Sequence, residues 1–301
     1  MKTLLVISLL TGFSTGVLAQ DIEELLSKYT QGNGMNYLQP LADAAGADFN
    51  TGLFHGGAIR KMGFQLYIGI TMPVALIPEK HKYFTGLPEG FFEPKNPEEV
   101  PTIFGPSETV IVDGDGGTQY AFPAGINMDY LPMPMAHLTV GSVFGTDATF
   151  RFLSTSTNEE LGRLNLFSFG LRHSITQYLP GFPVDIAAGI YNQYFKLGTI
   201  VDARTWLFNL QGSYDVSIFT FYGALGYERS NLGIEYSFTG NGDETVVNFD
   251  LRGSNSVRLT AGVTFNFGPV KLNADYNLAN QSVVSVGLGI GFGEKNDDNN
   301  K

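Results

Sequence analysis

The chain of 301 residues contains no cysteine, so it can form neither a disulfide framework, nor a thiolate metal site, nor a lipidated N-terminal cysteine. It is also poor in charge, because 16% of its residues are Asp, Glu, Lys or Arg, whereas soluble domains average about 25%. After the first 20 residues, no stretch approaches the roughly 18 consecutive apolar residues of a transmembrane helix. The formal net charge of −11 argues against nucleic acid as a partner.

The first 19 residues have the form of a secretory signal peptide. Lys2 supplies a positive start, and the apolar stretch from Leu4 to Leu18 is too short to span a membrane. Val17 and Ala19 then stand at positions −3 and −1 of a cleavage site before Gln20. We therefore expect residues 1–19 to be removed on export.

Glycine and aromatic residues are abundant, with 37 Gly, 24 Phe and 14 Tyr. From Phe64 onward, apolar and polar residues alternate with a period of two, which is the side-chain period of a β-strand. The alternation is clearest at 257–267, 270–278 and 284–292, where the apolar face carries neither a charge nor an amide. Each stretch has the roughly 9–11 residues that a tilted strand needs to cross a bilayer. The pattern predicts a β-barrel over residues 64–293.

The number of strands stays open at this point. Ten strands follow from the pattern, at 64–72, 134–143, 146–154, 163–175, 183–196, 201–214, 217–229, 257–267, 270–278 and 284–292. Two further hairpins surround glycine-rich turns, one at 107–113 with 118–122 and one at 232–239 with 245–252. The total is therefore ten, twelve or fourteen, an even number in each case.

Alternation alone does not say which face lies outside, because a soluble barrel alternates with its apolar face inward. Three features favour the lipid-facing arrangement. Short turns at 145–146, 215–216 and 268–269 alternate with long connections such as 76–133 and 230–255, and both barrel ends fall on the short-turn side. Aromatic residues gather near the strand ends, at Phe144, Tyr178, Phe182, Tyr214, Phe219, Phe267 and Phe292 on one side and at Phe195, Tyr227 and Tyr276 on the other. The predicted fold is all-β, a transmembrane antiparallel up-and-down β-barrel of 10–14 strands in the outer membrane.

Residues 20–63 precede the barrel and have helical spacing instead. Asp21 to Tyr29 and Asn36 to Ala45 are two candidate helices, the second ending near Gly46. This short helical segment is either a plug in the lumen or a periplasmic arm. We expect the plug, because short isolated helices are marginal in water. Residues 294–301 form a polar tail after the last strand.

The polar face of the strands carries the candidate lumen-lining residues, which are Arg151, Arg172, Asp185, Tyr191, Gln193, Glu228, Arg258, Lys271 and Asp275. Two interpretations compete for them. In a narrow barrel, opposite charges pair across the lumen and hold the wall rigid. In a wider barrel they line a solute path, because the interior widens with strand number.

No set of residues with enzymatic chemistry stands out, and we expect no enzyme, no cofactor and no metal. His173 and Ser174 are adjacent on a predicted strand, so their side chains point to opposite faces and cannot form a nucleophile–base pair. The stretch from Asp113 to Gly117 is similar to the start of a calcium loop. It has glycine at the fifth position and no acidic residue at the twelfth, so we interpret it as a turn.

Several of these segments together resemble a known family. They are the signal peptide, residues 20–63, Pro132-Met133-Pro134-Met135, and the hairpin from Val140 to Asp147 before Thr149-Phe150-Arg151. They resemble an uncharacterised family of Bacteroidota outer-membrane barrels, which is similar in turn to fatty-acid-transporter-type (FadL-like) barrels. The resemblance covers most of the mature chain. It implies an N-terminal hatch, a role that residues 20–63 match by position, and it identifies no ligand-binding residue.

The expected function is passive passage of a small apolar solute across the outer membrane, through a lumen plugged by residues 20–63. The alternative is a non-conducting structural or partner-binding barrel that acts through the external loops 76–133 and 230–255. Loop 76–133 is rich in phenylalanine and proline, which suggests an ordered cap. Outer-membrane lipid is the expected partner in both cases, and the solute and the oligomeric state stay open.

Overall fold

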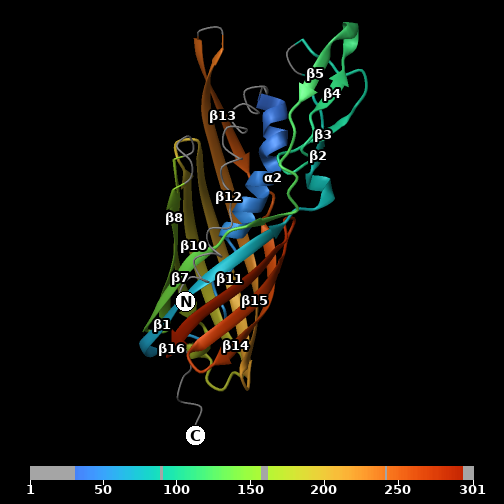
Figure 1. The fold of residues 1–301 in the computed structure, drawn as a ribbon. Helices are drawn as coiled ribbons and strands as arrows, with labels where there is room; N and C mark the ends of the chain where they lie inside the picture. The colour runs from blue at the N-terminus through green and yellow to red at the C-terminus, as the bar shows by residue number, and fades with distance from the viewer. Residues whose placement is uncertain (1–30, 89–90, 157–161, 241–242, 294–301) are drawn as a thin grey trace, which may run out of the picture.

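The computed structural model describes residues 31–88, 91–156, 162–240 and 243–293. The expected signal peptide, the first expected helix and the polar tail lie outside these residues. The described part of the chain forms a β-barrel with a helix that enters one end, and a small lobe beside that same end (Figure 1).

Ten antiparallel strands close the barrel. In order around the wall they are β1 (Met62–Leu76), β7 (Met135–Val143), β8 (Thr146–Ser156), β9 (Arg163–Ser174), β10 (Asp185–Leu197), β11 (Val201–Val216), β12 (Phe219–Gly240), β14 (Val257–Phe267), β15 (Val270–Leu278) and β16 (Val283–Phe292). The first and last strands pair with each other, Ile68 opposite Ile290, and so complete the ring. The predicted antiparallel up-and-down barrel is confirmed, and its wall has ten strands.

The two extra hairpins exist but do not enlarge the wall. β13 (Asp243–Arg252) pairs with the far half of β12 and extends beyond the barrel as a ribbon (Figure 1). β4 (Val110–Asp113) and β5 (Gln119–Phe122) pair with each other in the lobe. Twelve and fourteen are therefore wrong as the number of strands in the wall. Alternation predicts that a segment is a strand, but which strand it pairs with depends on contacts distant in sequence.

The barrel has a short-turn end and a long-loop end. At the short-turn end, β7 and β8 are joined through Phe144 and Gly145, both with positive φ (50° and 67°). Positive φ at both central residues suits the twist of a two-residue hairpin. The strands β1 and β16 begin and end, respectively, at this same end (Figure 1). The lobe and the β12–β13 ribbon lie at the long-loop end, which matches the predicted asymmetry.

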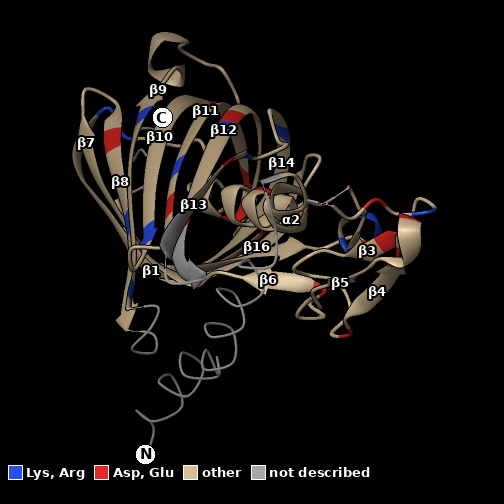
Figure 2. Ribbon diagram, turned by 90° about the horizontal axis from the view of Figure 1, so that it is seen from above, with Lys and Arg blue, Asp and Glu red and all other residues tan. Residues whose placement is uncertain are grey.

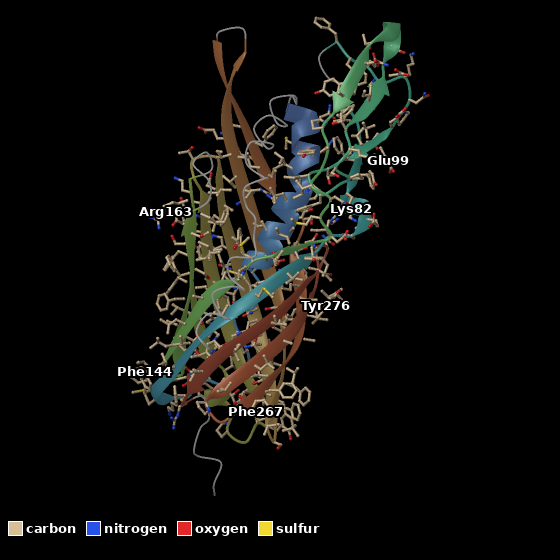
Figure 3. All side chains as sticks on the ribbon, in the orientation of Figure 1. Lys82, Glu99, Phe144, Arg163, Phe267 and Tyr276 are labelled. Carbon is tan, nitrogen blue, oxygen red and sulfur yellow. The ribbon has the colours of Figure 1, made fainter. Side chains whose placement is uncertain are left out.

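Through the middle of the wall, side chains alternate between a mostly apolar outer face and a mostly polar inner face. Outward residues such as Phe152, Leu259 and Leu288 are 54–58% exposed. Inward residues such as Thr149 and Ser168 are fully buried. Phe144 and Phe267 lie at the short-turn rim, with Tyr276 higher on the wall (Figure 3). A soluble barrel has the reverse polarity, so this wall is built to face lipid.

Replacing an outward residue near mid-wall with arginine tests whether this face contacts lipid. Val286 lies opposite Met72 and Ala274 in the register of β16, and it is 41% exposed. Val286→Arg should cost about 2–4 kcal/mol, because the guanidinium would sit in hydrocarbon. Unfolding by urea from phospholipid vesicles, followed through the single tryptophan, Trp206, measures this. Val286→Ala is the matched control; equal stabilities of the two variants would mean that this face does not contact lipid.

A single long helix, α2 (Gln31–Phe49), enters the barrel from the long-loop end and lies inside the ring of strands (Figure 2). It contacts β12, β13 and β1. The chain then runs on to the short-turn end, where β1 begins; we call residues 31–61 the inner segment. The predicted end near Gly46 is wrong. A side chain there would collide with Ser230 on β12, so this glycine serves close packing within a continuing helix.

The lobe lies outside the ring, and its described residues are 77–88 and 91–129 (Figure 2). It holds a 3₁₀ turn (Glu79–His81), β2 (Tyr83–Thr85), β3 (Glu99–Pro101), β4, a second 3₁₀ turn (Asp115–Gly117) and β5, and β6 (Tyr130–Pro132) returns the chain to β1. Its buried apolar residues belong to the same cluster as those of α2 and include Phe92, Val100, Phe104, Val112 and Phe122. Among the described residues, no helix is long and apolar enough to cross a bilayer.

Candidate functional site in the barrel lumen

Two wall arginines cap the C-terminal end of α2. Arg151 on β8 donates from Nη1 to the Thr51 carbonyl oxygen at 2.5 Å and from Nη2 to the Phe49 carbonyl oxygen. Arg258 on β14 donates from Nη2 to the Ala47 carbonyl oxygen at 2.9 Å and from Nη1 to the Thr51 hydroxyl. The last carbonyls of a helix lack partners within it and carry the negative end of its dipole. Buried guanidinium groups satisfy both needs.

Carboxylates on the wall form ion pairs with two lumen arginines, Arg258 and Arg172. Arg258 and Glu228 are 2.9 Å apart and both side chains are 2% exposed. Arg172 and Asp147, opposite each other on β9 and β8, make two hydrogen bonds at 2.5 and 2.9 Å. Arg172 also donates to the Gly56 carbonyl oxygen at 2.8 Å. Pairing offsets the large cost of burying such charges. At these two arginines, the lumen agrees with the first interpretation above, in which opposite charges pair in a narrow barrel.

Amide side chains add a third point of contact with the inner segment. Gln193 on β10 donates to the Phe49 carbonyl oxygen at 3.1 Å and to Oδ1 of Asn50 at 2.7 Å. The hydroxyl of Thr205 on β11 donates to the same oxygen of Asn50 at 3.0 Å. The chain just after α2 is thus hydrogen-bonded to three strands on one side of the wall, β8, β10 and β11, with β9 between β8 and β10.

Two further candidates, Tyr191 and Asp275, face inward and are hydrogen-bonded to other wall residues. Tyr191 accepts a hydrogen bond from Gln211 at 2.8 Å, and its ring lies against Gly170, where a Cβ would collide with it. Asp275 accepts a hydrogen bond from the Tyr222 hydroxyl at 2.9 Å.

Two candidates lie near the short-turn end. Asp185 is half-buried at the start of β10, opposite Ser213. Lys271 donates to the Asn266 side chain at 3.0 Å. All nine candidate residues therefore lie on the inward side of their strands, and four of them, Arg151, Arg172, Gln193 and Arg258, bind the inner segment directly.

Sequence reasoning missed the partners that make this arrangement. Asp147 lies on the same face of β8 as Arg151, so the side-chain period of two could have identified Asp147 as a lumen residue. Asn50 and Thr51 carried only a turn signal, and nothing in their spacing indicates that wall arginines and amides bind them.

A cluster of three rings joins the inner segment to the wall. His55 lies 5.0 Å from His137 on β7 and 4.9 Å from Tyr67 on β1, measured between ring centroids. The carbonyl oxygen of His55 accepts a hydrogen bond from Thr264 at 3.0 Å. Burial lowers the pKa of His55 to about 3, and the positive charges of Arg172, Lys271 and Arg151 act in the same direction. The docked inner segment therefore holds His55 neutral.

Acid should weaken the docking of the inner segment. A histidine released into water has a pKa near 6.5, whereas docked His55 has one of about 3. The released state therefore binds more protons between these values, and docking loses free energy as the pH falls from about 6.5 to 3. Planar-bilayer recordings at pH 7 and pH 4 should show more openings in acid. His55→Gln should make the openings less dependent on pH; the same acid response in that variant would contradict the assignment.

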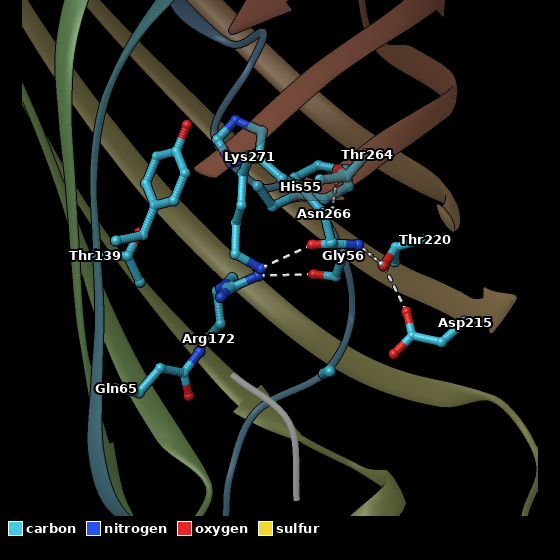
Figure 4. Close-up of a pocket in the computed structure, with 13 residues that line it drawn as sticks. His55, Gly56, Gln65, Thr139, Arg172, Asp215, Thr220, Thr264, Asn266 and Lys271 are labelled. Atoms are coloured by element: carbon cyan, nitrogen blue, oxygen red, sulfur yellow. Dashed lines mark hydrogen bonds between the residues drawn. The ribbon is translucent and has the colours of Figure 1, made fainter. Parts of the chain in front are cut away.

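A cavity of about 50 Å³ remains between the inner segment and the short-turn end (Figure 4). Lys271, Asn266 and Arg172 line it together with His55 and Gly56. Its volume suits a few water molecules, since one water needs about 10–15 Å³ of such space. In the part of the chain that the structure describes, no three His, Asp or Glu side chains are placed to hold a metal ion.

A closed antiparallel barrel with an apolar exterior and a filled polar lumen defines a transmembrane β-barrel protein. The model of a family of unknown function, DUF6588, matches residues 1–292, and the chain belongs to that family. No curated protein sequence matches the chain significantly.

Solved outer-membrane barrels resemble the structure at low overlap. OmpT, an outer membrane protein of Vibrio cholerae, is 10% identical, covers 77% of this chain and 100% of its own, and has a TM-score of 0.27. The toluene transporter TbuX of Ralstonia pickettii is 10% identical, covers 79% of this chain and 92% of its own, and has a TM-score of 0.25. Such scores carry no argument about the activity of this chain.

Proposed function

We propose that this barrel lets a small apolar solute cross the outer membrane, and that the inner segment blocks the lumen until it is displaced. One observation carries the proposal. The inner wall changes from polar to apolar toward the long-loop end, where Leu153, Leu164, Leu197 and Val201 face inward and are half-buried. These side chains pack against the cluster that contains α2 and stay partly exposed, so they offer an apolar surface at the entrance to the lumen.

These four residues, which we call the apolar mouth, form one continuous surface. Leu164 on β9 lies opposite Leu197 on β10, which in turn lies opposite Val201 on β11. They pack against the same apolar cluster as α2. An apolar solute that enters from this end would meet the mouth first and α2 next.

Displacement of the inner segment is the step that would open a path. Beyond α2, Leu53 and Phe54 pack in an apolar cluster with Tyr222 and other wall residues. The other contacts are hydrogen bonds to charged and amide groups, each with a net contribution of about 1–3 kcal/mol. These net values already allow for the water that replaces each bond in the vacated lumen. A lumen closed partly by such hydrogen bonds is better suited to reversible opening than one closed by packed apolar side chains alone.

Dye entry into cells tests the proposal. An outer leaflet of lipopolysaccharide slows the entry of apolar dyes, so cells without their own major porins should take up N-phenyl-1-naphthylamine faster when they contain this barrel. Leu164→Asn with Leu197→Asn should reduce that gain several-fold. Arg163→Gln, next to Leu164 on the opposite face, is the matched control. Uptake equal to that of barrel-free cells would overturn the proposal.

A partner-binding barrel is the second candidate, and the lobe favours it. Phe91 and Ile111 on the lobe have relative exposures of 105% and 63%. Exposed large apolar side chains on an ordered external element are a common feature of protein interfaces. Substituting both with serine separates the candidates, because dye entry should persist if the barrel transports and capture of a partner should cease if the lobe recruits one.

A further inference from the structure

Three arginines gather on the outer face of the wall near the long-loop end. In the register of β11, β12 and β13, Arg204 and Arg252 lie on either side of Asn231. Arg229 lies two residues further down β12, beside Trp206. All three arginines point outward and are exposed. We call Arg204, Arg229 and Arg252 the arginine triangle.

Sheet geometry brings these three side chains within reach of one ligand. Adjacent strands lie about 4.8 Å apart, so the Cα atoms of Arg204 and Arg252 are separated by about 10 Å. Arg229 lies about 7 Å below that line, because two residues of a strand span that distance. Among the described residues, no carboxylate forms an ion pair with any of the three. Three extended guanidinium groups can therefore converge on one anion.

The height of the triangle on the wall indicates what that anion is. Directly below it, the outward residues are Phe208, Tyr227 and Val257, which begin the apolar belt. Directly above it, Asp202 and Asp250 lie on either side of Gly233. The positive charges are thus confined to the boundary between the apolar belt and the polar loops. Aromatic side chains mark this boundary in membrane barrels, and lipid headgroups lie at the same level.

We propose that the arginine triangle binds a phosphate group of a glycolipid in the leaflet around the long-loop end. Arginine suits this role because its planar fork donates two parallel hydrogen bonds to a phosphate. A lipid fits better than a soluble anion, since the site opens sideways onto the apolar belt and its acyl chains would continue down past Tyr227 and Phe208. The chain as a whole has a formal net charge of −11, so a cluster of three arginines differs from the rest of the molecule.

Native mass spectrometry of the full chain in non-ionic detergent tests this site with diphosphoryl lipid A as the probe. The triple variant Arg204→Gln, Arg229→Gln, Arg252→Gln should bind the lipid at least about tenfold more weakly. Arg163→Gln, an outward arginine on β9 away from the triangle, should bind as the unmodified chain does. Heat-modifiable gel mobility verifies that each variant is folded.

Two ligand controls separate the sources of phosphate. Lipid A stripped of both phosphates should bind the unmodified chain as weakly as diphosphoryl lipid A binds the triple variant. Inorganic phosphate at the same concentration should not displace the lipid. Equal binding by the triple variant, equal binding of the stripped lipid, or displacement by inorganic phosphate would each overturn the proposal. None of these outcomes depends on whether the barrel passes a solute.

Discussion

Deleting residues 31–58 should turn a closed barrel into a conducting one. The deletion removes α2 and the chain that Arg151, Arg172 and Gln193 hold, and it leaves the wall strands intact. The vacated lumen would be lined by charged and amide groups, which water readily solvates. In planar bilayers we expect steady channel steps at least about tenfold more frequent than those of the unmodified chain, since an unplugged barrel interior admits ions.

A milder variant keeps this expectation testable if the deletion hinders insertion. Asn50→Ala with Thr51→Val removes the side-chain bonds to Gln193, Thr205 and Arg258 and keeps the chain length. It should give brief, repeated openings. Silence from both variants, with insertion verified, would show that the inner segment does not control a path through the barrel.

Replacing Arg258 with methionine should produce the largest loss of stability of any single change in the lumen. Arg258 pairs with Glu228 at 2.9 Å, and both are 2% exposed. Breaking a buried pair from one side leaves the other charge uncompensated, which costs about 3–5 kcal/mol. The variant also loses the cap on the Ala47 carbonyl oxygen. Urea unfolding from vesicles, followed through Trp206 fluorescence, gives the difference.

The double variant Arg258→Met, Glu228→Leu separates the charge from the cap. It removes both charges, so it should regain a substantial part of the lost stability and still lack the bond to Ala47. If the double variant were as unstable as the single one, the pair would not account for the loss.

The sequence predicted which way each wall residue points, because a strand has a side-chain period of two and lipid requires an apolar outer face. All nine candidate lumen residues lie inward for that reason. The cross-strand partner of each residue could not be predicted, because pairing depends on the register between strands. Nothing local places Arg172 opposite Asp147, or Arg204 and Arg252 beside Asn231.

The extent of α2 illustrates a second limit. Gly46 disfavours a helix, so the sequence predicted a helix that ends there. Packing against Ser230 and capping by Arg151 and Arg258 extend it to Phe49. These contacts come from strands more than a hundred residues away, and tertiary contacts of this kind outweigh helix propensity.

One engineered disulfide tests the position of the inner segment inside the barrel most directly. A Cβ built on Gly56 lies 3.9 Å from that of Ser213 on β11, which is close to the separation of about 3.8 Å in disulfides. The chain has no cysteine of its own, so Gly56→Cys with Ser213→Cys introduces the only pair. Gly56→Cys with Tyr214→Cys is the control, because Tyr214 points outward from the next position. Mild oxidation in intact membranes should cross-link the first pair nearly completely and leave the second unlinked; free thiols in both pairs, open to a water-soluble maleimide, would contradict the account.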